Sequence, residues 1–179
     1  MRWFLLPLLS LLPLQQIADL ELAQIPFDGA AFRDAFNNAS DQSRLVLVIS
    51  PTCPNCLQKA ADVEDILRRH PEARIRVFVL WAPYMRTDNV SQAQRASQYL
   101  TDRRARHFWD LWRFGTRAYS EQFSVPPPYA WNLMTFYKPH LVWRDSPPPP
   151  TFWLHALADY GPVYTKGALE LELRPWVEP

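Results

Sequence analysis

The clearest pattern along the chain is a pair of apolar runs separated by a stretch of helical periodicity. Residues 45–49 are continuously apolar and rich in β-branched side chains, which is typical of a strand covered on both faces of a sheet. Residues 75–81 form a second such run. Between them, apolar residues recur at helical spacing from Leu57 to Leu67 until His70-Pro71 ends the pattern. This order predicts a βαβ unit with two parallel strands and a right-handed crossover.

Weaker patterns on either side of this unit predict the remaining elements. Asp28 is an expected N-cap for a helix that runs to about Ala39. Further along, the sequence predicts helices capped by Ser91 and Asp110, a short strand at 107–109, a hairpin of 131–137 with 141–143 around a turn at 138–140, a terminal helix at 151–157, and an edge strand or ordered tail at 168–173. In the helix after Asp110, one face is expected to carry Trp112, Thr116, Tyr119 and Phe123.

The first residues have the pattern of an export segment. One positive charge at Arg2 precedes an apolar stretch at 3–14, which suits a signal peptide core and is short for a membrane span. We expect residues 1–23 to be a signal peptide or an uncleaved N-terminal membrane anchor, with cleavage after Ala18 or Ala23. The alternative is a buried N-terminal helix interrupted by prolines. The export hypothesis places residues 24–179 in the periplasm or another extracellular-facing compartment, anchored to the membrane if the leader stays attached.

Composition limits the number of domains and the class of partner. The 179 residues, less a leader, suffice for one domain with a substantial core. The 19 basic and 18 acidic residues give no concentrated basic surface, so we expect no nucleic-acid partner. Among the 18 prolines, runs at 126–128 and 147–150 predict rigid extended connections late in the chain. The oligomeric state stays open.

The candidate chemistry lies in Cys53-Pro54-Asn55-Cys56, which follows the first buried strand and opens the predicted helix. These are the chain's two cysteines, and so short a loop contributes little as a structural disulfide. Unpaired backbone N–H groups at a helix N-terminus lower a thiol pKa, so we expect Cys53 to be the nucleophile and Cys56, one turn further in, to resolve the mixed disulfide. Pro54 favours the first turn, and neither Pro54 nor Asn55 brings a cation.

The order of strand, Cys-x-x-Cys, helix and parallel strand resembles the thioredoxin superfamily over about residues 28–160. The stretch 108–119 is also similar to uncharacterised bacterial thioredoxin-like proteins. The resemblance implies an α/β fold, with a central mixed sheet flanked by helices, here between an N-terminal export segment and a Pro-rich C-terminal extension. It also implies a thiol–disulfide oxidoreductase that acts on protein thiols or disulfides as substrates or redox partners.

The sequence departs from this superfamily at three places. Thr52 stands where members usually carry tryptophan before the first cysteine. Trp131 falls where a cis-proline is expected, unless Pro126 takes that role. Residues 45–49 hold no buried acid, so we assign no general base.

Other interpretations of the same residues remain open. The pair at 53 and 56 also suits a non-catalytic binding module or half of a zinc or copper site, but His70, His107, His140 and His155 are scattered without ligand spacing. We therefore expect no metal and no cofactor. Most aromatic residues are expected in the core, namely Trp81, Trp109, Trp112, Trp131 and Trp143. Tyr84 and Met85, in the loop after the second strand, are candidates for exposed partner contacts.

Overall fold

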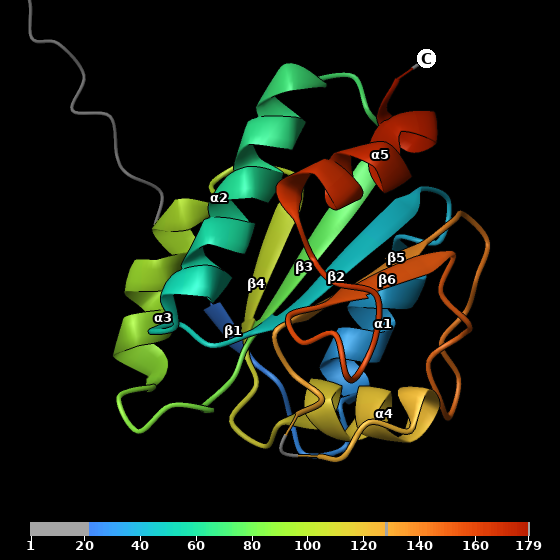
Figure 1. The fold of residues 1–179 in the computed structure, drawn as a ribbon. Coiled ribbons are helices and arrows are strands. Elements are labelled where there is room, and N and C mark those ends of the chain that lie inside the picture. Colours follow the sequence, from blue (N-terminus) through green and yellow to red (C-terminus); the bar gives the residue numbers. More distant parts are fainter. Residues whose placement is uncertain (1–21, 128, 179) are drawn as a thin grey trace, which may run out of the picture.

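The computed structural model describes residues 22–127 and 129–178, and these form a mixed sheet with helices on both faces (Figure 1). The six strands lie in the order β1-β4-β3-β2-β5-β6. The elements in chain order are β1 (Leu22–Gln24), α1 (Ala30–Asn38), β2 (Ser43–Ile49), α2 (Pro54–Arg69), β3 (Ile75–Trp81), α3 (Val90–Ala96), a short 3-10 turn (Ser97–Tyr99), β4 (Ala105–Trp109), α4 (Phe114–Phe123), β5 (Leu133–Tyr137), β6 (Phe152–His155) and α5 (Lys166–Val177). This is the α/β architecture expected from the sequence.

The predicted βαβ unit forms the centre of the sheet. β2 and β3 pair in parallel, with Leu45 opposite Val77 and Ile49 opposite Trp81. β4 and β1 continue the parallel half, whereas β5 and β6 pair antiparallel on the other side of β2. Every residue of β2 is buried, because the strand is central and both faces are covered.

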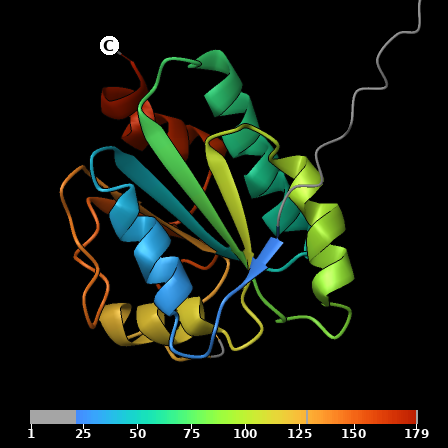
Figure 2. The ribbon, with the colours of Figure 1, turned by 180° about the vertical axis from the view of Figure 1, so that it is seen from behind.

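Alternating side chains of the central strands feed two separate cores. Leu45, Leu47 and Ile49 face the layer of α2, α3 and α5. Val46 and Val48 face α1 and α4, which Figure 2 shows on the opposite side of the sheet. This second core is largely aromatic; the ring of Phe32 lies within 6.2 Å of those of Phe36, Phe78, Phe108, Phe114 and Trp143.

Three helices begin later or differently than predicted. α1 starts after Gly29, whose φ of 72° and close approach to the Phe114 ring leave no room for a side chain. The Asp28 carboxylate accepts from the N–H group of Ala30, the first residue of the helix. α3 is capped by Asn89 instead of Ser91. Asp110 accepts from the N–H groups of Phe114 and Gly115, so its carboxylate caps α4 from further away than a standard N-cap.

The predicted face of α4 was wrong at its first member. The helix begins only at Phe114, because Arg113 adopts a left-handed conformation with φ of 53°. Trp112 therefore lies outside the helix and is 50% exposed, whereas Thr116 and Tyr119 are buried as expected.

The C-terminal third differs most from the sequence prediction. β5 pairs with residues 152–155, predicted as a helix, and not with 141–143, so the expected hairpin was wrong. Trp143 instead packs against α1, where the Asn37 side chain donates to its carbonyl (2.9 Å) and accepts from its N–H (2.8 Å). Residues 168–173 lie in α5, capped by Thr165, and not in a strand or tail. The predicted terminal helix at 151–157 was therefore wrong, because these residues form β6, and the last helix of the fold is α5 at Lys166–Val177.

The predicted leader lies almost entirely outside the described residues. Leu22 and Ala23, at its end, belong to β1 and pair with β4. In the part of the chain that the structure describes, no helix has both the length and the apolar character needed to cross a membrane. Leader and cleavage site therefore stay predictions.

Candidate active site

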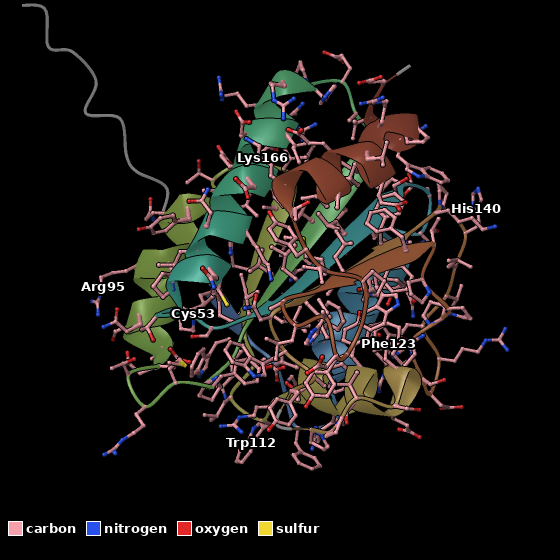
Figure 3. All side chains as sticks on the ribbon, in the orientation of Figure 1. Cys53, Arg95, Trp112, Phe123, His140 and Lys166 are labelled. Atoms are coloured by element: carbon pink, nitrogen blue, oxygen red, sulfur yellow. The ribbon has the colours of Figure 1, made fainter. Side chains whose placement is uncertain are left out.

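The cysteine pair lies where β2 passes into α2, at the carboxyl edge of the parallel strands. Cys53 is the N-cap of α2, and its carbonyl accepts from the N–H groups of Cys56 (3.0 Å) and Leu57 (3.1 Å). Pro54 occupies the first turn, where the lack of an N–H group costs no hydrogen bond. Figure 3 shows Cys53 at the lower end of α2. The sequence prediction that the pair opens this helix is confirmed.

The two thiols have opposite environments. Cys53 is partly exposed and Cys56 is fully buried, and both are free cysteines. A hydrogen bond from the Cys56 thiol, supported by N–H groups of Cys56 and Asn55 and by the charge of Lys59, lowers the pKa of Cys53 from 9.0 to about 6. Burial, together with the neighbouring Cys53, raises the pKa of Cys56. The backbone N–H of Ser50 lies 3.4 Å from the Cys56 sulfur. The geometry makes Cys53 the accessible thiolate and Cys56 a shielded thiol.

Lys59 is a site residue that the sequence analysis missed. It lies one turn after Cys56 on the inner face of α2, and only 3% of the residue is exposed. Its Nζ donates to the backbone carbonyl of Asn132 (3.0 Å) and to the Asn132 side-chain oxygen, and it lies 4.6 Å from the centre of the Tyr164 ring. Burial lowers the pKa of Lys59 to about 8. The sequence did contain a signal for this residue, because Lys59 is a charged residue at a helical position that faces inward, between Cys56 and Val63.

Asp88, also missed, holds the loop before Cys53 against the loop after β3. Its carboxylate accepts from Ser50 Oγ (3.0 Å) and Thr52 Oγ1 (2.5 Å) on one side. On the other side it accepts from the backbone N–H groups of Tyr84 (2.8 Å) and Met85 (2.7 Å). Thr52, where a tryptophan is usual, therefore serves as a hydrogen-bonding tether to this carboxylate.

A mainly apolar groove of about 430 Å³ lies beside the Cys53 sulfur. Its lining residues come from the cysteine loop, the loop after β3 and the segments flanking β5 and β6: Cys53, Asn55, Met85, Tyr129, Trp131, Asn132, His155, Ala156 and Leu157. Met85 is 46% exposed in it, as predicted, and its contact with a partner stays a prediction. Tyr84 differs from the prediction, because it is half-buried and stacks on Trp131 with ring centres 4.5 Å apart.

Comparison with known proteins identifies the architecture. No family model matches the sequence, and no curated protein does. Among solved structures, MTB dsbF, determined in mixed oxidized and reduced forms, matches with a TM-score of 0.51 at 13% identity, over 88% of this chain and 96% of the other. A thioredoxin-like protein from Aeropyrum pernix also matches with a TM-score of 0.51 at 13% identity, over 78% of this chain and 80% of the other. The chain has a thioredoxin-like fold.

In this thioredoxin-like fold, the position expected for a cis-proline is occupied differently. Trp131 and Asn132 precede β5, and Asn132 has a φ of 54°. Pro126 lies in a turn closed by the Tyr129 N–H (2.8 Å) and does not line the groove. No cis peptide bond occurs within residues 22–127 or 129–178.

The rings of His107 and His155 have hydrogen-bond partners within the protein. His107 accepts from Trp81 Nε1 (3.0 Å), and its other ring nitrogen lies 2.8 Å from the Leu100 carbonyl. His155 accepts from the Leu157 N–H (2.9 Å) and contacts the Tyr129 carbonyl (2.8 Å), which joins two walls of the groove. Across the described residues, no group of three or more His, Cys, Asp or Glu side chains is arranged to hold a metal ion.

Proposed function

We propose that the protein is a thiol–disulfide oxidoreductase that acts on protein thiols or disulfides through Cys53 and Cys56. The observation that supports this most is the pairing of a partly exposed sulfur at a helix N-terminus with a buried thiol that donates a hydrogen bond to it. A purely structural role would not require one sulfur to open onto an apolar groove.

The proposed reaction consists of two exchanges. The Cys53 thiolate attacks one sulfur of a partner disulfide, so a Cys53–partner bond forms and the second partner sulfur leaves as a thiolate. Cys56 then loses its proton to that departing thiolate and attacks the Cys53 sulfur. The products are the Cys53–Cys56 disulfide and two reduced partner sulfurs, with two electrons passed to the partner. The reverse sequence oxidises a partner dithiol.

The deciding experiment is a redox titration of the pair against glutathione buffers, with alkylation read by mass and metal content measured on the same sample. We expect a reversible two-electron transition, loss of exchange activity in Cys53→Ser, and accumulation of mixed disulfides in Cys56→Ala. A pair that never cycles, or that retains zinc or copper through purification, would favour the binding-module alternative.

We further propose that the protein works outside the cytoplasm. The proposal depends on the charge and apolar pattern of the leader. Cell fractionation of the full-length chain, with mass analysis of its N-terminus, should find it in an exported fraction, either cut near Ala18 or intact at the membrane. Recovery in the cytoplasm with an intact leader would contradict the proposal.

A further inference from the structure

The region around the cysteine pair contains a buried cation where the sequence suggested none. The titratable groups that line this region, besides the thiols, come from five elements or loops and are Lys59, Asp62, Tyr84, Asp88, Tyr129, His155 and Tyr164. The carboxylates among them are engaged elsewhere. Asp62 accepts from Gln58 (2.9 Å) and from the Tyr164 hydroxyl (2.6 Å), and Asp88 accepts from four donors in the loops before Cys53 and after β3.

Lys59 itself has no carboxylate partner. Among the described residues, none of the ion pairs includes it, and its Nζ is held by neutral oxygens of Asn132 and by the face of the Tyr164 ring. Burial of an ammonium without a counter-ion costs desolvation free energy, so a charge kept in such a place is a candidate for a functional role. With a pKa of about 8, Lys59 is still about 90% protonated at pH 7.

We propose that Lys59 shifts the redox equilibrium of the Cys53–Cys56 pair toward the dithiol, by placing a positive charge near sulfurs that are anionic only in the reduced state or during exchange. The inference builds on the proposed oxidoreductase function. Because the disulfide carries no charge, Lys59 stabilises the dithiol form selectively and makes the pair a stronger oxidant. The same charge favours the thiolate that Cys56 must become to resolve a mixed disulfide.

Asn132 and Tyr164 are what keep the charge in place. Asn132 lies directly before β5 and has a left-handed backbone conformation. The backbone next to the strand therefore helps to fix where the Asn132 oxygens lie. The Tyr164 hydroxyl is fixed in turn by Asp62. Lys59 is thus a positioning residue that acts through the cysteines, and it does not need to touch the substrate.

The test compares Lys59→Met with Lys138→Met, which removes the same charge from an exposed side chain at the far end of β5. Two quantities are measured for each: the pKa of Cys53, from thiolate absorbance, and the equilibrium constant with glutathione. A rise of half to one pKa unit from about 6 lowers the ratio of reduced to oxidised protein at pH 7 about three- to fivefold, and we expect this for Lys59→Met alone. Lys59→Arg, which retains the charge, should restore much of the difference.

Asn132→Asp provides a second route if Lys59→Met does not fold. The substitution is nearly isosteric, tolerates the left-handed backbone, and pairs the ammonium with a carboxylate, so the pKa of Cys53 should again rise. The inference is overturned if wild type cycles in glutathione but neither Lys59→Met nor Asn132→Asp differs from Lys138→Met. Failure of the wild type to cycle at all would instead overturn the proposed function.

Discussion

Removal of the Cys56 thiol should change the reactivity of Cys53 in a pH-dependent way, because the Cys56 hydrogen bond is the main cause of the lowered Cys53 pKa. With a pKa of about 6, Cys53 is about 90% thiolate at pH 7, compared with ~1% at the ordinary value of 9.0. In Cys56→Ala the pKa of Cys53 should rise by about 1.5 units, as expected for the loss of a hydrogen bond to a charged group.

Two effects then oppose each other in the alkylation rate. At pH 5.5 the thiolate fraction falls from ~24% to ~1%, whereas the remaining thiolate becomes ~5-fold more nucleophilic because its pKa is higher. Cys56→Ala should therefore react about 5-fold more slowly than wild type at pH 5.5 and about 5-fold faster above pH 9, so the two profiles cross near pH ~7.

The assay is the rate of iodoacetamide alkylation of the reduced protein across pH 4.5–9.5, with mass detection of the modified residue. Cys56→Ser is the matched control, because its hydroxyl keeps a donor at the same position and should keep most of the lowered Cys53 pKa. Parallel profiles for wild type and Cys56→Ala, or equal shifts in the Ala and Ser variants, would refute the reasoning.

Three further substitutions test the parts of the fold that hold the site. Asp88→Ala leaves the Met85 N–H without its acceptor, whereas the Tyr84 N–H keeps the Ala82 carbonyl (3.1 Å), and the change should lower the free energy of unfolding in urea by about 1–3 kcal/mol, with a smaller loss for the Asn variant. Phe32→Ala, at the centre of the aromatic core, should cost about 3–5 kcal/mol in the same assay, against less than about 1 for exposed Phe27→Ala. Asn37→Ala removes both hydrogen bonds to the Trp143 backbone and should cost about 1–2 kcal/mol, and no change would mean that ring packing alone fixes that segment.

The half of the chain that could be predicted from sequence is the half with local signals. The run in β2, Pro54 in the first turn of α2 and the apolar run of β3 each depend on neighbouring residues, and their pairing follows from the length of the crossover. The cysteine pair lies where the first strand of this unit passes into its helix. Its position could therefore be predicted before any contact was known.

The C-terminal third depends on contacts that no local pattern encodes. Residues 141–143 and 152–155 are both short apolar runs, but β5 pairs with the second, whereas Trp143 of the first is held against α1. The alternation of leucine and glutamate at 169–173 is typical of a strand. In the structure, Leu169 and Leu173 are buried one helical turn apart while Leu171 is 63% exposed, so the helical period prevails.

Asp88 and Lys59, the two site residues that the sequence analysis missed, have different electrostatic roles. Asp88 uses its carboxylate on four hydrogen-bond donors and fixes the geometry of the two loops, whereas Lys59 has neutral partners and leaves its charge available to the sulfurs. Substitutions at Asp88 should therefore mainly change the free energy of unfolding, and substitutions at Lys59 should mainly change the redox equilibrium. Because the two side chains share no hydrogen-bond partner, their effects on the free energy of unfolding should add in the double variant to within about 0.5 kcal/mol. A larger deviation would mean that geometry and charge are coupled through the cysteine loop.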